Sequence, residues 1–509
     1  MKSKFFKRII TLALCPALLI GCLAFSGISA AAAGDDPPQS AWEMTVPQVR
    51  VTTENGNGTT LQKEDGYQAA SVTITDVDGA TLSDSCSFKV RGNTTALSWI
   101  EKKAFTFKFA KKKDVLGMGK GKKWALIANA FDPTLLRNYT AFSLAHELGL
   151  AYTSEFRVVE LWVDDVYRGC YLLTEPVQEG KERVNIDIES NGGMQDFLME
   201  FERQREEDDV TYFTVDGMRF IASEPEEPTE EQLAYIQGKV QDVITTIRTG
   251  TREQIEEKVD IESFAKYFVL NEFCKTFDFD TSSVYFYYKD GKLYAGPPWD
   301  YDLSLGNANP DYGTRGKNAY EPEDPFAQNK NIYRFLCQNA WFYDEVRAVL
   351  REHSDFIADI GADGGLADRA AAQYADVIAR NYQDAGWRVS KWWINIQLKP
   401  QATYEANLDY LKSWCVQRSA WMDACYHPFR ETVPVGDADG DGRLTIGDAT
   451  YIQRVLAEQL VPEDEERFLL RADITGDGLS IDDVTLVLRY LAEFGDDNPI
   501  GETRDYDPA

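Results

Sequence analysis

Apolar and polar residues alternate along much of the first third of the chain. The alternation recurs in the segments 49–51, 70–74, 88–91 and 105–109. A period of two residues is typical of strands with one buried face, so these segments predict half-buried β-strands joined by turns. Two further apolar segments, 156–163 and 169–174, flank Asp164-Asp165 and predict a hairpin.

A second predicted hairpin carries aspartates at both ends. The aromatic and β-branched run 284–288 is followed by a turn containing Asp290-Gly291 and by a short apolar run. Asp278 and Asp280 precede it, and Asp300 and Asp302 follow it. A hairpin brings its ends together, and four converging carboxylates repel one another unless a cation neutralises them. Oxygen ligands of this kind suit Mg²⁺ or Mn²⁺; the alternative is that they are acidic strand ends in an acidic chain.

Helical patterns dominate elsewhere. Asp132-Pro133 predicts the start of a helix that runs to about Leu148, and residues 331–426 are mainly helical. The glycine-rich basic segment 111–123 is predicted to be a turn with solvated lysines, because a strand rather than a helix follows it. Glu160 and Glu175 stand in otherwise apolar strands, where a lone acid needs a cationic partner or a metal.

Composition narrows the function classes. The chain has 509 residues, enough for several domains, and a net charge of −30, which disfavours binding to nucleic acid or to anionic lipid because both need a cationic face. Only three histidines are present, which argues against histidine triads and histidine-rich metal sites. Beyond the first 33 residues no apolar run is long enough to predict a transmembrane helix.

The N-terminus predicts secretion. Residues 1–33 combine four basic residues, an apolar run and a string of alanines, the three-part layout of a signal peptide, and residues 34–45 read as a linker. Leu19-Ile20-Gly21-Cys22 resembles a lipobox, so lipoprotein anchoring at Cys22 is the alternative. Cys415 and Cys425 are close enough in sequence to suggest one disulfide.

Near the C-terminus two acidic loops share a spacing. The first has oxygen-bearing residues at loop positions 1, 3, 5, 9 and 12, a backbone carbonyl at 7 and glycine at 6, as an EF-hand-type calcium loop requires; its ligands are Asp437, Asp439, Asp441, Arg443, Thr445 and Asp448. The second copy supplies Asp473, Thr475, Asp477 and Asp483. The loop starts are offset by 36 residues but the closing aspartates by 35, so the second loop is one residue short.

This duplicated loop-helix, residues 435–494, resembles a type I dockerin. The resemblance implies two calcium ions, the second less certain, and docking to a cohesin on the scaffold of a polysaccharide-degrading cellulosome. The expected cohesin-binding residues are Ile446, Gly447, Ile481 and Asp482. A generic calcium sensor is disfavoured because the sequence shows no paired entering helices, and residues 495–509 are expected to be a flexible tail.

Residues 46–430 resemble the spore-coat-protein-H (CotH) family of atypical secretory kinases. The resemblance rests on several separated motifs: Arg91-Gly92-Asn93, Lys102-Lys103, Leu136-Arg137-Asn138, Tyr167-Arg168-Gly169, and Pro298-Trp299-Asp300-Tyr301-Asp302. It implies ATP, Mg²⁺ or Mn²⁺, and transfer of the γ-phosphoryl group to Ser or Thr of a secreted protein. The expected fold is α+β: a distorted kinase-like domain with antiparallel hairpins and a helical C-terminal part, plus a small all-α calcium-binding module.

Phosphoryl transfer needs positioning and charge neutralisation, which suggests roles for particular residues. Lys103 is the candidate phosphate-binding lysine, held by Glu160 or Glu175, and Arg137 is a second phosphate contact. Asp300 and Asp302 are expected to bind metal, and Asp278 or Asp280 to be the catalytic or second metal-binding acid.

Two alternatives to the kinase stay open. Relatives commonly carry an asparagine shortly after the first aspartate, where this chain has Thr281-Ser282-Ser283. A catalytically inactive adhesion or carbohydrate-binding domain is therefore one alternative. A glycoside hydrolase is the other, because paired acids serve that chemistry too, although no recognisable hydrolase pattern surrounds these acids.

Overall fold

The computed structural model describes residues 43–190, 193–203, 210–388, 403–426, 431–492, 494 and 499–506. The predicted signal peptide, the lipobox and nearly all of the predicted linker lie outside these residues. Within them, no helix has the length and apolar character needed to cross a membrane.

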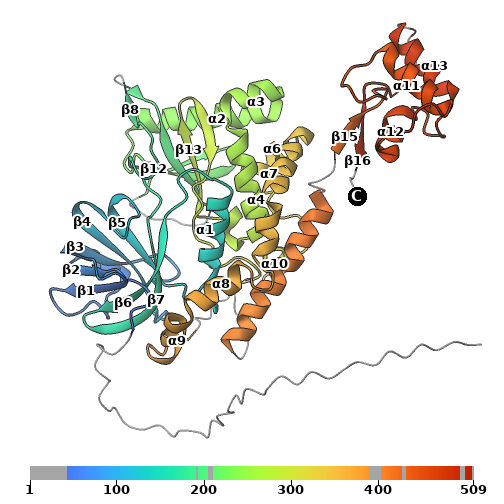
Figure 1. Ribbon diagram of the computed structural model, residues 1–509. Helices are drawn as coiled ribbons and strands as arrows, with labels where there is room; N and C mark the ends of the chain where they lie inside the picture. Colours follow the sequence, from blue (N-terminus) through green and yellow to red (C-terminus); the bar gives the residue numbers. More distant parts are fainter. Residues whose placement is uncertain are drawn as a thin grey trace, which may run out of the picture. The chain divides into compact units, whose positions relative to one another are not determined.

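The N-terminal part is a closed barrel in the order β1-β2-β3-β4-β5-β7-β6 (Figure 1). Neighbouring strands are antiparallel except β1 and β6, whose parallel pairing closes the barrel. Alternate residues such as Val72, Ile74, Phe88 and Val90 are buried, which confirms the predicted half-buried strands. The strands are β1 (Gln48–Thr53), β2 (Gln68–Thr75), β3 (Thr81–Arg91), β4 (Ala104–Asp114), β5 (Lys120–Ile127), β6 (Phe156–Val163) and β7 (Val166–Thr174).

A second sheet has the order β11-β12-β10-β13-β14. Its last two strands are the predicted aspartate-flanked hairpin, which is confirmed: they pair antiparallel across a turn at Asp290-Gly291. The strands are β10 (Phe197–Phe201), β11 (Tyr212–Val215), β12 (Met218–Glu224), β13 (Val284–Lys289) and β14 (Lys292–Ala295); β8 (Glu189–Ser190) and β9 (Gly193–Met194) form a separate short pair.

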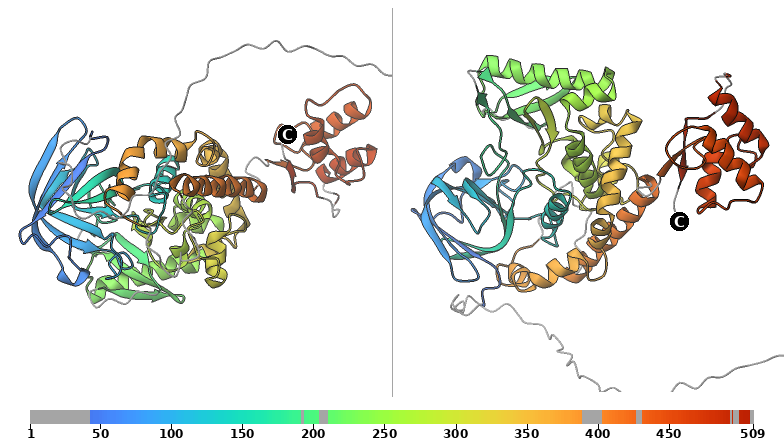
Figure 2. Two further views of the ribbon diagram at one scale, coloured as in Figure 1. Left: turned by 90° about the horizontal axis from the view of Figure 1, so that it is seen from below. Right: turned by 45° about the horizontal axis from the view of Figure 1, so that its top comes forward.

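Helices pack beside both sheets (Figures 1 and 2). Helix α1 packs on the barrel through Tyr139 and Phe142, whose rings meet Phe156 of β6, and on α4 and α7 at its other side. The helices are α1 (Arg137–Glu147), α2 (Glu230–Thr249), α3 (Arg252–Lys258), α4 (Ile261–Cys274), α5 (Gly313–Tyr320), α6 (Tyr333–Leu336), α7 (Ala340–Asp359), α8 (Leu366–Gln373), α9 (Ala375–Gln383) and α10 (Tyr404–Tyr426). The mixed α+β class is confirmed.

Two local predictions, the start of α1 and the disulfide, are wrong, and a third is confirmed only in part. Helix α1 begins at Arg137, because the Asp132 carboxylate accepts hydrogen bonds from Thr134 and from the Arg137 amide, and this holds residues 132–136 in a turn. The basic segment 111–123 has the predicted turn at 116–118 and exposed lysines on both sides of it, but the residues flanking the turn are the paired ends of β4 and β5. Cys415 and Cys425 are free thiols on α10, ten residues and hence about 15 Å apart along the helix axis, too far for a disulfide.

The C-terminal module has its own core, built around Val435, Ile452, Phe468, Val484 and Val487. It contains three helices, α11 (Ile446–Leu456), α12 (Glu465–Ala472) and α13 (Ile481–Leu491). Helix α12 directly precedes the second acidic loop, so the expectation that entering helices are lacking is wrong for that loop.

The expected flexible tail is also wrong for residues 499–506. They include β16 (Thr503–Tyr506), which pairs antiparallel with β15 (Glu431–Pro434). Ile500 is buried in the module core, and the Tyr506 hydroxyl donates to Asp464. Burying these two side chains compensates for the entropy lost when the segment is ordered.

Candidate active site and acidic loops

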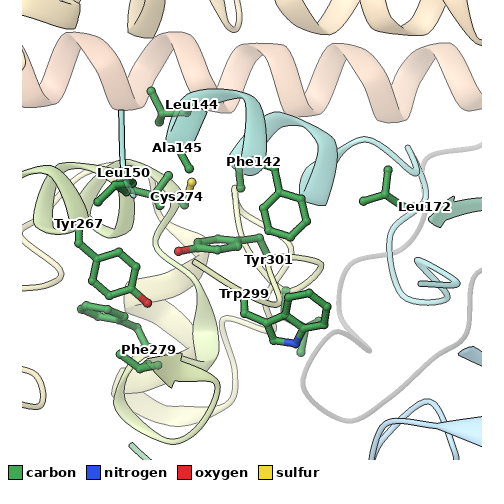
Figure 3. Packing of buried hydrophobic residues seen from close by; sticks show 14 of the residues in the cluster. Phe142, Leu144, Ala145, Leu150, Leu172, Tyr267, Cys274, Phe279, Trp299 and Tyr301 are labelled. Carbon is green, nitrogen blue, oxygen red and sulfur yellow. The ribbon is translucent and has the colours of Figure 1, made fainter. Parts of the chain in front are cut away.

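The two Asp-aromatic-Asp segments lie at the ends of the β13-β14 hairpin. Asp278 belongs to a 3-10 turn, η3 (Phe277–Asp280), and Asp300 to the loop after β14. The aromatic residues between the aspartates point into the core, where Phe279 and Tyr301 are 0% and 1% exposed. Tyr301 and Trp299 lie beneath Phe142 of α1 (Figure 3). Burial of the aromatic side chains therefore directs the aspartates to the opposite side of each segment.

Asp278, Asp300 and Asp302 are half-buried and close enough to affect one another electrostatically. Loss of water and then the Asp278 charge raise the pKa of Asp300 to about 6. Desolvation followed by the charges of Asp300 and Asp278 raises the pKa of Asp302. Carboxylates this close repel one another when ionised, which raises their pKa values. A bound cation would neutralise that repulsion.

The structure separates Asp278 from Asp280. Asp278 accepts from the Arg315 guanidinium at 2.9 Å and from the Thr281 hydroxyl at 3.1 Å. Burial raises its pKa, while Arg315 opposes the rise. Asp280 instead accepts from Arg203 at 2.8 Å. Of the two acids, Asp278 is the one that shares the electrostatic environment of Asp300 and Asp302.

Hydrogen bonds from other elements hold the backbone around Asp300 and Asp302. Asp300 has a φ of 66°, a left-handed conformation that is uncommon for a residue with a side chain. The Asn138 side chain accepts from the Tyr301 amide at 2.8 Å, and the Asn307 side chain donates to the Asp302 carbonyl at 2.7 Å. Helix α1 thus holds the loop at Tyr301, the residue between Asp300 and Asp302.

Arg137 is part of this scaffold. It is 1% exposed; its guanidinium pairs with Asp132 and donates to the carbonyls of Ser304 at 2.9 Å and Leu305 at 3.3 Å. Each of its three side-chain nitrogens already has a partner, so the predicted contact with a phosphate is at odds with the structure. Its contacts tie α1 to the loop that follows Asp302.

The predicted lysine-glutamate pair is not formed between the described side chains. Lys103 donates to the carbonyls of Ala96 and Leu97. Glu160 pairs instead with Arg380 at 2.7 Å, and Glu175 with Arg183. The reason is that each glutamate meets an arginine from a neighbouring element, which neutralises it in the barrel wall. Burial raises the pKa of Glu175 to about 8 even so.

Two residues near the aspartates were assigned no role from the sequence. Arg91, at the end of β3, lies over the Trp299 ring at 5.0 Å, and its charge lowers the pKa of Asp300. Glu200 of β10 accepts from the Ser283 amide at 3.0 Å, and its charge raises the pKa of Asp300. The available signals were the Arg91-Gly92-Asn93 motif and an acid inside the buried run Phe197–Phe201.

The first acidic loop brings its carboxylates together. Ligand oxygens of Asp437, Asp439 and Asp441 lie within 4.8 Å of one another, and this is the one such group of three or more among the described residues. Asp437 is 3% exposed, and its Oδ1 is buried with no hydrogen-bond partner in the described part of the chain. Asp448 is fully buried and accepts from the Thr445 amide at 2.8 Å, which closes the loop.

The second loop is closed in the same way. Asp483 accepts from the Ser480 amide at 2.8 Å, as Asp448 does from Thr445. Both loops lead into a helix through a capping box. The residues expected to face a cohesin lie at these helix starts, and Ile446 and Ile481 are 69% and 60% exposed.

Comparison with protein families identifies a family for the large domain. A family model described as CotH kinase protein matches residues 88–422, a segment that contains the end of β3, both aspartate segments and most of α10. Comparison with curated proteins finds no match.

Proposed function

The chain belongs to the CotH kinase protein family, and from that premise we propose that residues 46–430 are a secreted, atypical protein kinase with a distorted kinase-like fold. The reaction is transfer of the γ-phosphoryl group of ATP, with Mg²⁺ or Mn²⁺, to Ser or Thr of an extracellular protein. The observation that carries the proposal is that the β13-β14 hairpin brings Asp278 near Asp300 and Asp302, all three half-buried and within electrostatic range of one another.

The donor set fits a divalent metal. Carboxylate oxygens are what Mg²⁺ prefers, and Asp300 and Asp302 are half-buried rather than sealed in the core. The metal would supply charge neutralisation at the phosphates. Asp300 and Asp302 would hold it, and Arg91, whose charge acts on Asp300, would offset negative charge at the same place.

Asp278 would orient the acceptor hydroxyl and receive its proton. Its carboxylate is fixed by Arg315 and Thr281, and its pKa is raised by burial, which suits an acid that takes up a proton. Asp280 pairs with the half-exposed Arg203 and has a lesser role.

The test is phosphate incorporation from labelled ATP into the secreted proteins of the producing culture, with and without metal. Asp300→Asn is expected to abolish incorporation. The matched control is Asp290→Asn in the hairpin turn, where φ is 49° and asparagine is well tolerated; it should retain activity. Incorporation by Asp300→Asn at the wild-type rate would overturn the proposal.

A second candidate is a catalytically silent domain with an adhesive or carbohydrate-binding role. This chain has Thr281-Ser282-Ser283 where relatives commonly carry an asparagine shortly after the first aspartate, and Arg315 already donates to both Asp278 and Thr281. The Arg315 guanidinium thus places a positive charge beside Asp278, where a second metal ion would otherwise be expected. This favours a site that lacks one metal ion. Thermal shifts separate the candidates: a metal-dependent shift with ATP supports the kinase, and a shift with oligosaccharides alone supports the silent domain.

For residues 431–506 we propose a type I dockerin that binds a cohesin in a calcium-dependent manner. The support is the carboxylate group of the first loop with its unpartnered Asp437 oxygen, and the exposure of Ile446 and Ile481. Ile446→Asp and Ile481→Asp combined should abolish capture by a cohesin panel that binds the wild type in calcium. Tight binding that persists in excess chelator would contradict the proposal.

A further inference from the structure

We propose that the C-terminal module binds a single calcium ion, in loop 437–448, and that hydrogen bonds replace the ion in loop 473–483. This inference rests on the proposal that the module is a calcium-dependent dockerin, and it departs from the two ions that the resemblance implies. It follows from comparing the two loops position by position.

At loop position 1 the two aspartates differ in their partners. Asp437 accepts one amide, from Gly442 at 3.2 Å, while its other oxygen is buried and unpartnered among the described residues. Asp473 accepts from the Gly476 amide at 2.8 Å and from the Gly478 amide at 3.0 Å, so both of its oxygens are satisfied. A buried carboxylate oxygen with no donor needs a cation; one with amide donors does not.

At loop position 3 an acid is replaced by a donor. Asp439 adds a fourth carboxylate to those of Asp437, Asp441 and Asp448 in the first loop, whereas Thr475 places a hydroxyl in the second loop. The Thr475 hydroxyl lies within hydrogen-bonding distance of three carboxylates, those of Asp473 at 3.4 Å, Asp483 at 3.3 Å and Asp477. The hydroxyl has one proton and donates it to one carboxylate at a time, so the second loop has an internal donor at this position where the first loop has a further acid.

The missing residue removes a ligand. Between the glycine at position 6 and the capping residue, the first loop has Arg443-Leu444 and the second has Leu479 alone. Leu444 and Leu479 both pack against the module core, so Leu479 corresponds to Leu444. The residue with no counterpart is therefore Arg443, whose carbonyl is the position-7 ligand.

The closing aspartate of the second loop is also better satisfied. Asp483 accepts from the amides of Ile474 at 2.8 Å, Thr475 at 3.2 Å and Ser480 at 2.8 Å. Asp448 accepts from two, Asp439 at 3.2 Å and Thr445 at 2.8 Å. The differences at the first, third and closing positions thus all give the second loop more internal hydrogen bonding.

The test is the number of calcium ions bound per full-length chain, by equilibrium dialysis with labelled calcium. Excess Mg²⁺ occupies the carboxylates of the large domain. We expect one ion for the wild type, none for Asp437→Asn, and one for Asp477→Asn, whose amide oxygen can still accept from Thr475. Two ions in the wild type, or loss of an ion in Asp477→Asn, would overturn the inference while leaving the dockerin proposal intact.

A repaired loop provides the positive control. Thr475→Asp together with one arginine inserted after Gly478 restores an acid at position 3 and the residue at position 7. We expect this variant to bind two ions; one ion would mean that the differences named here do not decide binding. Failure of the wild type to bind any calcium would instead overturn the dockerin proposal itself.

Discussion

Two groups of aspartates in this protein are assembled over different distances in the chain. Asp437, Asp439 and Asp441 come from one loop, with glycines that let it turn tightly. Asp278 and Asp300 come from the two ends of a hairpin, and their neighbours are fixed by residues far away in sequence, such as Asn138. A local loop carries its own geometry, whereas the large-domain group depends on the packing of the whole domain.

The largest expected effect is a loss of stability in the large domain, and it tests whether the Asp278 and Asp300 group depends on the packing of that domain. Arg418 of α10 and Glu272 of α4 form a fully buried ion pair at 2.7 Å, and Glu272 also accepts from the Phe326 and Ala327 amides. Arg418→Met leaves Glu272 buried without its cation, so it should cost about 3 to 5 kcal/mol in the free energy of unfolding. The thermal transition of the large domain reports this loss.

A partly buried lysine on the same helix, whose acidic partners are more exposed, is the matched control. Lys412 pairs with Asp363 and Asp368, and its partner Asp363 is fully exposed. Lys412→Met should therefore change the unfolding free energy by no more than about 1 kcal/mol. Calcium binding by the C-terminal module should survive both substitutions; its loss in Arg418→Met would contradict the independence of the two aspartate groups.

The next effect concerns the link between α1 and the Asp300 loop. Asn138→Leu keeps the side-chain size but removes the acceptor for the Tyr301 amide. Asp300 and Asp302 should then lose their orientation, and the rate of phosphate transfer should fall about 10- to 100-fold, the usual cost of losing a support of metal ligands. Steady-state rates at saturating metal measure this, and an unchanged rate would show that the loop keeps its geometry without α1.

A pH effect of about tenfold should follow from the raised pKa of Asp300. Since that pKa is about 6, the carboxyl gains a proton as the pH falls through 6, and a proton competes with the metal. Apparent affinity for Mg²⁺ should therefore weaken about tenfold between pH 7 and pH 5. Titration of Mg²⁺ against phosphate transfer at each pH is the measurement; an affinity that is constant across this range would exclude Asp300 as the titrating ligand.

The smallest effect separates the two acidic loops. Ser480 caps α13 by accepting from the Asp482 amide at 3.1 Å, so Ser480→Ala should cost about 1 kcal/mol of module stability. That cost should be the same with calcium and with chelator if the second loop binds no ion. Thr445→Ala, the equivalent change in the first loop, should cost more in calcium than in chelator. Calorimetry measures both costs from the unfolding transition of the C-terminal module, which is recognised as the transition whose temperature falls when chelator is added.

Local patterns predicted much of the fold correctly. The half-buried strands of the barrel and the β13-β14 hairpin follow from alternation and from turn residues, which act over a few positions. The start of α1 was wrong because the Asp132 carboxylate is used in a turn and in the Arg137 ion pair. The turn and the ion pair use the same Asp132 carboxylate that would otherwise cap a helix at this position. Pattern analysis treats these residues separately and does not detect this competition.

In the candidate site, too, local motifs were predictable from the sequence and long-range partners were not. Asp300 and Asp302 were found from their motif, yet the partners of Lys103, Glu160 and Glu175 were not. A buried charge pairs with whichever opposite charge the packed chain brings near it, and for Glu160 that is Arg380, 220 residues away. Spacing in the sequence contains no such information.

By itself, the sequence determined the family, the mixed α+β class and the spacing of the aspartates in both acidic loops, because each depends on residues close together or on a motif. Only the tertiary structure decided that Asp278 rather than Asp280 lies with Asp300, and that Arg137 supports the site from within the core. It also decided which loop has its carboxylates satisfied. The physical reason is that burial and hydrogen-bond partnership are properties of the packed chain.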